Sequence, residues 1–298
     1  QSKNRSVVMT LGSFDGIHLG HQRLINLAVD RAKELNCDSS LFTFKPHPLK
    51  IIAPDKAPKA LTSWLQQRKI IASLGINQIV SKKFTKIFSQ MPFDEFVIKY
   101  LVNRFSVKEI IVGEDFRCGY KSQGTPAKLA QLGNKFGFKV QAISAVKISN
   151  QEASSTYIRQ AVMDGAMNKV KEQLGRNYKI DCRVIQGDQR GRRLGFPTAN
   201  LQPVTSYALP PAGVYACKVH LEGKVYQGIA NLGLRPTFAK EEFAIEVHIF
   251  NFSGQIYNKR LELEFFNKIR DELKFSNEQE LITRIKKDVK LAEKILTE

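Results

Sequence analysis

The stretch that decides the fold is VVMTLGSFDGIHLGH, residues 7–21. A continuous apolar run, residues 7–11, ends in Gly12, as expected for a strand buried on both faces of a sheet. From His21 onward the apolar residues recur at helical spacing. This stretch therefore predicts a buried strand, a glycine-containing turn and an amphipathic helix.

Strand-like runs and helical periodicity alternate up to about residue 175. The expected strands are residues 40–44, 76–80, 109–112 and 139–146. The expected helices are residues 61–74, 93–105 and 125–136. Repeated strand–helix–strand units predict a parallel sheet covered by helices. The first part of the chain is therefore expected to be an α/β domain.

A different pattern begins after Gly175. Short strand-like runs dominate, at residues 180–185, 213–220, 224–230, 243–249 and 260–266. Glycine-containing turn signals separate these runs, which predicts an antiparallel barrel or sandwich. Apolar residues at helical spacing over residues 278–296 predict a terminal helix. We therefore expect two domains, residues 1–177 and residues 178–298.

The composition is that of an ordinary globular protein. The 298 residues are 43% hydrophobic and 25% charged, which argues against disorder and low complexity. No apolar run approaches the roughly 18 residues that a membrane-spanning helix needs, and residues 1–6 are polar and basic, unlike a signal peptide. The four cysteines lie far apart and form no C-x-x-C pair, against a zinc knuckle or a disulfide scaffold. We expect a soluble cytoplasmic protein.

The formal net charge of +18 is concentrated in the first part of the chain. Residues 1–175 carry a net charge of +13 and the remainder carries +5. Three interpretations stay open: a surface that binds nucleic acid, an enzyme that attracts small polyanions, and lysine-rich solvated faces without a specific partner. Charge alone does not choose among them.

Two histidines stand where open α/β sheets bind ligands, at the carboxyl end of the first strand. His18 and His21 are three residues apart at the expected start of the first helix. The N–H groups and dipole of a helix N-terminus attract phosphate, and Gly12 and Gly20 let the backbone approach a nucleotide closely. The imidazoles could hydrogen-bond phosphoryl oxygens as negative charge develops. The competing interpretations are a metal-binding pair and ordinary turn chemistry.

A second candidate segment, SSTYIR, opens a later helix. The hydroxyls of Ser154, Ser155 and Thr156 could cap the helix and bind phosphate, and Arg159 could reach a leaving pyrophosphate. Such a segment alone is more often a simple helix cap. Together with the histidine motif it indicates nucleotidyl transfer, a reaction that needs positioning and charge neutralisation more than a strong base.

A third dense motif is GDQRGRRLGFPTAN, residues 187–200. It is not a Walker loop, because G-x-x-x-x-G-K-[ST] occurs nowhere in the chain. Its glycines and arginines could fold over a triphosphate, with Thr198 and Asn200 supplying oxygen ligands to magnesium. Composition alone favours a basic hairpin with a proline turn.

The order of these motifs resembles that of the bacterial bifunctional riboflavin kinase/FMN adenylyltransferases, also called FAD synthetases. Further matching segments follow the family's order: TFKPHP (43–48), VGEDFRCG (112–119), GVYA (213–216), NLGLRPT (231–237) and EVH (246–248). The resemblance implies an N-terminal Rossmann-like nucleotidyltransferase domain with a parallel sheet. It also implies a C-terminal antiparallel β-barrel of riboflavin kinase type with a terminal helix.

The resemblance also implies the two reactions and their participants. The C-terminal domain would phosphorylate riboflavin to FMN, and the N-terminal domain would adenylylate FMN to FAD with release of pyrophosphate. ATP with Mg²⁺ would serve both steps. The expected partners are therefore the small molecules riboflavin, FMN, FAD, ATP and pyrophosphate, with no nucleic acid and no membrane. We expect a monomer or a weak homo-oligomer.

Site residues follow from the same resemblance. Adenylyl transfer would use the catalytic residues His18, His21 and Arg159. It would also use the binding residues Gly12, Phe14, Asp15, Gly20, Asp115, Ser154, Ser155 and Thr156. Phosphorylation would use Glu246 as the general base, with Thr198 and Asn200 on magnesium. The binding residues of that step would be Gly191, Arg192, Gly195, Pro197 and Arg270.

Three departures from the family pattern keep alternatives open. Ser13 stands where asparagine is common, Cys118 where phenylalanine is usual, and Lys121 where arginine is usual. One alternative is therefore a riboflavin kinase whose adenylyltransferase activity is weakened or lost. A class I aminoacyl-tRNA synthetase would share H-x-G-H but would need a K-M-S-K-S-like loop. A non-enzymatic regulator would be expected to have lost the catalytic residues, which are all present.

Overall fold

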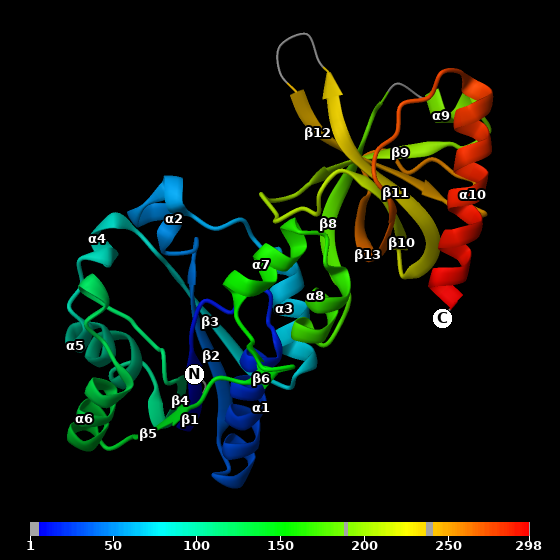
Figure 1. The fold of residues 1–298 in the computed structure, drawn as a ribbon. Helices are drawn as coiled ribbons and strands as arrows, with labels where there is room; N and C mark the ends of the chain where they lie inside the picture. The colour runs from blue at the N-terminus through cyan, green and yellow to red at the C-terminus, as the bar shows by residue number, and fades with distance from the viewer. Residues whose placement is uncertain (1–5, 188–189, 237–240, 298) are drawn as a thin grey trace. The chain divides into compact units, whose positions relative to one another are not determined.

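The computed structural model describes residues 6–187, 190–236 and 241–297 and divides the chain into two compact units (Figure 1). The first unit comprises Gln1–Pro58 and Trp64–Ser154, and the second comprises Lys59–Ser63 and Ser155–Glu298. Each unit has a hydrophobic core of its own. The chain therefore folds as two compact bodies.

The first unit is built on a five-stranded parallel sheet with the strand order β3-β2-β1-β4-β5. Its strands are β1 (Ser6–Leu11), β2 (Asp38–Lys45), β3 (Gln78–Lys83), β4 (Ser106–Gly113) and β5 (Lys139–Ile143). The order reverses between β1 and β4. In open α/β sheets the crevice at such a reversal is where ligands bind.

Helices cover both faces of this sheet, as the continuous apolar strands require. One face packs against α1 (Leu19–Glu34) and α3 (Trp64–Ser73). The other face packs against α5 (Phe93–Phe96), the π-helical turn η2 (Val97–Val102) and α6 (Pro126–Phe136). The remaining short elements are α2 (Leu49–Ile52), η1 (Pro54–Lys56), α4 (Lys86–Ser89), η3 (Tyr120–Ser122), β6 (Lys147–Ile148) and β7 (Gln151–Glu152).

The second unit is a closed antiparallel barrel with the strand order β10-β11-β12-β9-β8-β13. Its strands are β8 (Tyr178–Ile185), β9 (Thr198–Pro203), β10 (Gly213–Leu221), β11 (Lys224–Pro236), β12 (Glu241–Ile249) and β13 (Arg260–Arg270). Five of these were expected from hydrophobic patterning, whereas β9 was not, because it begins inside the P-T-A-N motif. The short helix α9 (Arg190–Arg193) precedes β9, and the terminal helix α10 (Glu278–Thr297) packs on the outside of the barrel.

Two helices that directly follow the α/β sequence pack with the barrel. These are α7 (Ser155–Met163) and α8 (Met167–Leu174), whose buried Ile158, Val162 and Leu174 share a core with the barrel strands. The compact second unit thus begins at Ser155. The boundary between residues 177 and 178 stays a prediction about where the two activities divide.

The short segment Lys59–Ser63 also belongs to the barrel unit. The Ala60 N–H donates to the Ser206 carbonyl at 2.8 Å, and the Ala208 N–H donates to the Ala60 carbonyl at 2.9 Å. The Leu61 side chain is buried in the barrel core. We expected Leu61 to open a helix of the α/β domain, and that expectation is wrong, because α3 begins only at Trp64.

Candidate active sites

The turn between β1 and α1 is strained and buried. Phe14 and Ile17 both adopt left-handed backbone conformations, with φ of +52° and +44°. Such conformations cost on the order of 1–3 kcal/mol each and persist where packing enforces them, often at functional sites. Here both side chains are fully enclosed, in a cluster with Ile25 and Val29. The turn therefore has a rigid shape.

The two predicted histidines contact each other at the beginning of α1. Nδ1 of His18 accepts a hydrogen bond from the His21 N–H at 3.4 Å and caps the helix. The two rings stack with their centroids 3.8 Å apart, and the Phe14 ring lies 5.1 Å from the His21 ring. A Cβ on Gly20 would lie only 3.0 Å from Nδ1 of His18, so glycine permits this close arrangement.

His21 is electrically neutral at neutral pH. Burial, and secondarily the neighbouring His18, lower its pKa well below the ordinary value of 6.5. Its Nδ1 atom is buried and has no hydrogen-bond partner among the described residues. A buried nitrogen without a partner costs free energy. The His21 ring therefore holds a hydrogen-bonding position that a ligand could satisfy.

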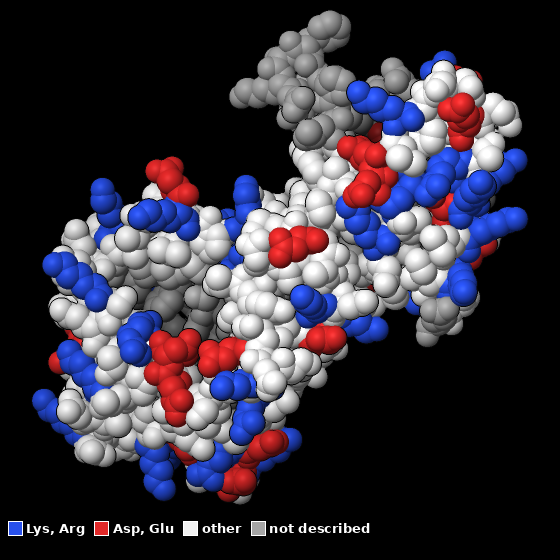
Figure 2. Space-filling model, in the orientation of Figure 1, with Lys and Arg blue, Asp and Glu red and all other residues white. Residues whose placement is uncertain are grey.

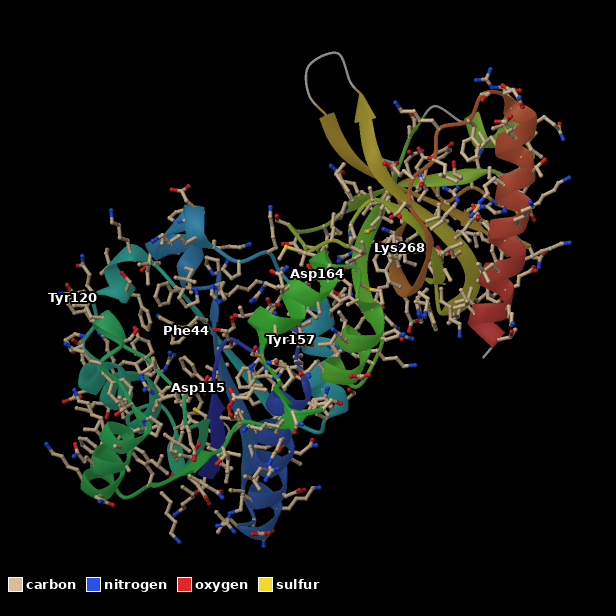
Figure 3. All side chains as sticks on the ribbon, in the orientation of Figure 1. Phe44, Asp115, Tyr120, Tyr157, Asp164 and Lys268 are labelled. Carbon is tan, nitrogen blue, oxygen red and sulfur yellow. The ribbon has the colours of Figure 1, made fainter. Side chains whose placement is uncertain are left out.

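Asp115 lies at the neighbouring strand end. It follows β4 and is labelled in Figure 3. Thr10 of β1 pairs with Ile111 of β4, which places the ends of both strands at one edge of the sheet. The Asp115 Oδ1 atom lies 2.6 Å from the position that a Cβ on Gly113 would take, so the carboxylate folds back over the strand end. The histidine turn and Asp115 thus both lie at the strand ends where the strand order reverses, and Asp15 is buried within that turn.

The SSTYIR segment is divided between the two units. Ser154 is the last residue of the first unit, and Ser155, Thr156 and Arg159 lie on α7 of the second unit. Within the second unit, the Nε–H of Arg159 donates to the Lys59 carbonyl at 2.7 Å. The segment 59–63 therefore holds Arg159 in place. Tyr157 and Asp164, labelled in Figure 3, mark the two ends of this helix region.

The barrel unit contains a cavity of about 330 Å³ beside β9 and β12. Antiparallel pairing places Glu246 opposite Asn200 and His248 opposite Thr198. Thr198, Glu246 and Arg270 line this cavity together. Its apolar walls include Leu194, Phe196, Val214, Ile229, Phe275 and Ile285. The cavity therefore combines an apolar chamber with the Glu246 carboxylate beside the Thr198 hydroxyl.

A second cavity of about 530 Å³ is lined by the same threonine. It is lined by Pro197 and Thr198, by Val247 and Ile249 of β12, and by the loop of residues 252–257. Thr198 lines both cavities, whereas Glu246 and Arg270 line only the first. Two small molecules bound in the two cavities would thus meet near Thr198.

The glycines of the third motif allow close packing against the predicted magnesium ligands. A Cβ on Gly187 would lie 1.9 Å from Nδ2 of Asn200, and a Cβ on Gly191 would lie 3.1 Å from Oγ1 of Thr198. Only glycine lets the chain lie so close at these positions. Gly195 has a positive φ of +85° in the turn before β9. The side chain of Arg192 lies outside the described residues.

The donor set around Thr198 fits a hard cation bound together with a nucleotide. Thr198 and Asn200 are two residues apart on β9 and offer a hydroxyl and an amide oxygen, which magnesium accepts. Among the described residues there is no cluster of three or more His, Cys, Asp or Glu side chains suited to a metal ion. A magnesium ion here would therefore take its other ligands from phosphate and water.

Several cavity residues had not been predicted from the sequence. His248 lines the first cavity, and its Nδ1–H donates to the Pro197 carbonyl at 2.8 Å. His248 could have been predicted from Glu246, because the two residues are two apart on β12 and such residues share a face of a strand. Asn231, Glu272 and Asp288 also line the cavity. They come from β11, from the segment after β13 and from α10, so no local motif could have grouped them.

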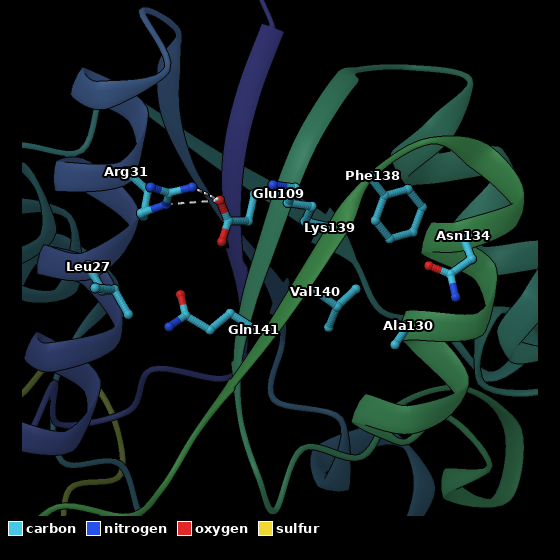
Figure 4. A pocket seen from close by; sticks show the side chains of 9 residues that line it. All are labelled: Leu27, Arg31, Glu109, Ala130, Asn134, Phe138, Lys139, Val140 and Gln141. Carbon is cyan, nitrogen blue, oxygen red and sulfur yellow. Dashed lines mark hydrogen bonds and ion pairs between the residues drawn. The ribbon is translucent and has the colours of Figure 1, made fainter.

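A third cavity, of about 600 Å³, lies in the first unit beside the start of β5 (Figure 4). The Nε–H of Arg31 on α1 donates to Oε2 of Glu109 at 3.0 Å, and Nη2 forms an ion pair with the same oxygen at 2.9 Å. The Glu109 side chain is only 6% exposed. No residue predicted for either reaction lines this cavity. The ion pair between Arg31 and Glu109 joins α1 to the sheet.

Cys118, a departure from the family pattern, is a structural residue. Its side chain packs against the core of the first unit. Burial raises the pKa of the Cys118 thiol to about 11. The thiol therefore stays protonated at neutral pH and is a poor nucleophile.

Comparison with protein families matches the chain in two consecutive parts. A model described as FAD synthetase matches residues 1–157, and one described as riboflavin kinase matches residues 174–296. These two matches define an enzyme of the transferase class with two modules that act on flavins. No helix among the residues placed by the structure is long and apolar enough to cross a membrane.

Curated relatives extend over nearly the whole chain. The bifunctional riboflavin kinase/FMN adenylyltransferase of Bacillus subtilis (strain 168) is 37% identical over 286 residues, covering 94% of this chain and 90% of the relative. The protein of the same name from Buchnera aphidicola (subsp. Schizaphis graminum) is 35% identical, covering 98% and 94%. That of Escherichia coli (strain K12) is 33% identical, covering 97% and 92%. The chain belongs to the family of bifunctional riboflavin kinase/FMN adenylyltransferases.

A solved structure has the same fold throughout. It is described as a macrolide-efflux protein from Streptococcus pneumoniae and aligns with a TM-score of 0.88 at 29% identity, covering 98% of this chain and 95% of that one. Because both family models match, the alternative of a kinase without adenylyltransferase activity is not favoured. The same matches favour a flavin transferase over an aminoacyl-tRNA synthetase or a regulator.

Proposed function

We propose that the chain makes FAD from riboflavin in two steps at two separate sites, with the residue roles predicted from the sequence. The observation that carries the kinase assignment is the pair of cavities that meet at Thr198, only one of which contains Glu246. A phosphoryl transfer needs one chamber for the acceptor alcohol and one for ATP, with the transferred group between them.

In the kinase step, riboflavin occupies the apolar cavity and ATP occupies the second cavity. The Glu246 carboxylate accepts the proton of the riboflavin 5′-hydroxyl as its oxygen bonds to the γ-phosphorus of ATP. The bond from that phosphorus to the bridging oxygen breaks, and ADP leaves. Thr198 and Asn200 would hold Mg²⁺, which when bound neutralises phosphate charge. Gly191, Gly195 and Pro197 shape the wall of the kinase site. Arg192 and Arg270 are the remaining predicted binding residues of this step.

In the adenylyl step, the FMN phosphate attacks the α-phosphorus of ATP and pyrophosphate leaves. His18 and His21 donate hydrogen bonds to phosphoryl oxygens at the beginning of α1. Ser155, Thr156 and Arg159 bind the leaving pyrophosphate. The neutral state of His21 supports a hydrogen-bonding role and not one as a fixed charge. The other predicted binding residues, Gly12, Phe14, Asp15, Gly20, Asp115 and Ser154, shape the nucleotide and flavin sites.

The proposed partners are small polyanions and riboflavin, with no nucleic acid. Figure 2 supports this choice, because lysine and arginine side chains are interspersed with acidic ones over the visible face. Nucleic-acid binding by contrast favours a continuous basic patch. We place the enzyme in the cytoplasm as a monomer or a weak homo-oligomer, with the activities divided between residues 177 and 178.

The direct test is incubation of the protein with riboflavin, ATP and Mg²⁺, followed by chromatographic separation of the flavins. FMN should appear first and FAD later, with one ADP formed per phosphorylation and one pyrophosphate per FAD. Omission of Mg²⁺ should stop both steps. Accumulation of FMN with no FAD, under conditions where supplied FMN is also not adenylylated, would contradict the bifunctional assignment.

A further inference from the structure

The terminal helix α10 forms one wall of the kinase cavity. Leu281, Ile285 and Asp288 of this helix line it. Asp288 is the one charged residue among these three, and its side chain is only 2% exposed. A carboxylate so deeply buried is costly unless it is paired. The buried Asp288 carboxylate therefore needs positively charged partners.

Two arginines share the Asp288 carboxylate. The Nε–H of Arg270 donates to Oδ2 at 2.8 Å, and the Nε–H of Arg284 donates to Oδ1 at 3.1 Å. The two arginines differ in burial: the Arg270 side chain is 12% exposed and that of Arg284 is 37% exposed. Arg270 lines the cavity, whereas Arg284 does not. The carboxylate thus joins one buried arginine of the site to one at the surface.

The contact with Asp288 is the only ion pair of Arg270 among the described residues. Arg270 is the last residue of β13, and its Nη1–H donates to the Asp271 carbonyl at 2.9 Å. Its guanidinium lies 5.8 Å from the ring centroid of Phe275. Its Nη2 group has no protein partner among the described residues. Nε and Nη1 of the guanidinium are therefore held by protein acceptors, which leaves Nη2 to bond a molecule in the cavity.

We propose that Asp288 is a positioning residue for the kinase reaction, holding Arg270 so that its guanidinium hydrogen-bonds the polar edge of the flavin. This inference rests on the proposed function, in which riboflavin occupies this cavity. Without the carboxylate, Arg270 would be a buried cation beside a second cation, Arg284, and would turn toward solvent. The flavin would then lose a charged hydrogen-bond donor, a contact of the stronger kind.

The test is a double-mutant cycle with Asp288→Asn and Arg270→Gln, read as the KM and kcat of the kinase step. Each single variant should raise the KM for riboflavin by about tenfold, the lower bound for loss of a hydrogen bond to a charged group. The KM for ATP should hardly change, because the nucleotide occupies the other cavity. The double variant should be no worse than Arg270→Gln alone. Asp288→Glu should restore part of the affinity for riboflavin.

Arg284→Gln is the matched control. It removes a positive charge and a hydrogen bond from the same carboxylate, but outside the cavity, so the KM for riboflavin should stay near the wild-type value. FAD formation from supplied FMN, measured in the same samples, reports that the chain is folded. If Asp288→Asn lowers this activity as well, Asp288→Glu replaces it in the cycle, with a smaller rise in the riboflavin KM expected.

The outcomes distinguish failure of the role inferred for Asp288 from failure of the proposed function. An unchanged riboflavin KM in the Asp288 variants, with a raised KM in Arg270→Gln, overturns the inference and leaves the proposed function standing. Effects that simply add in the double variant also overturn it, because Asp288 would then act independently of Arg270. An unchanged riboflavin KM in Arg270→Gln would remove Arg270 from the proposed flavin site itself.

Discussion

In the proposed mechanism individual side chains carry the chemistry of both sites, and Glu246 is the clearest case. We expect Glu246→Gln to lower FMN formation by about 10²–10⁴-fold, the usual contribution of a general base. The amide keeps the shape of the side chain but does not accept the proton. FAD formation from supplied FMN should be retained, since Glu246 lies in the barrel unit. Kinase turnover near the wild-type rate, measured by chromatography of the flavins, would remove Glu246 from this role.

His21 should make the stability of the first unit sensitive to acid. Its pKa is lowered in the folded chain, so below the ordinary value of 6.5 the unfolded chain binds a proton that the folded chain does not. Stability should be full above pH 6.5 and should fall as the pH drops toward the lowered pKa, by at most about 1.4 kcal/mol per pH unit. Urea unfolding at pH 7.5 and 5.5 measures this loss. His21→Gln should show a smaller loss, and equal losses in both proteins would refute the assignment.

At the scale of secondary-structure elements, the ion pair between Arg31 and Glu109 joins α1 to β4. Arg31→Ala should destabilise the first unit by about 2 kcal/mol, because it leaves a buried carboxylate without its charged donor. The matched control is Lys33→Ala, on the same helix, whose contact with Asp30 is solvent-exposed on both sides. Exposed pairs contribute little. Denaturant unfolding of both variants would test this, and equal effects would contradict it.

Elements whose patterns are local were predicted well. The helix predicted over residues 125–136 is α6, which Thr125 caps and Pro126 begins. Gly137 ends it in a left-handed conformation. The strand expected over residues 139–146 was too long, because β5 ends at Ile143. β9 was missed, since its short run of mixed residues has no hydrophobic alternation and is a strand only through pairing with β8 and β12.

At the scale of the whole molecule, the two proposed sites imply that the two reactions can be catalysed by two different chains. His21→Ala should abolish FAD formation while FMN accumulates from riboflavin, and Glu246→Gln should show the reverse defect. A mixture of the two variants should form FAD from riboflavin, because released FMN diffuses from one chain to the other. Chromatography of the flavins follows this. No FAD from the mixture, with both single activities intact, would mean that FMN is not released between the steps.

The sequence by itself determined the local elements, the order of the motifs and the family, because these depend on residue spacing and on backbone preferences of neighbouring residues. It also placed His18 and His21 together, since three residues span nearly one turn of a helix. Only the tertiary structure decided that α7, α8 and the segment Lys59–Ser63 pack with the barrel. Only the tertiary structure brought the Asp288 carboxylate into hydrogen-bond contact with Arg270. The physical reason is that such contacts join residues far apart in the chain, and their energies come from burial and pairing that no local pattern records.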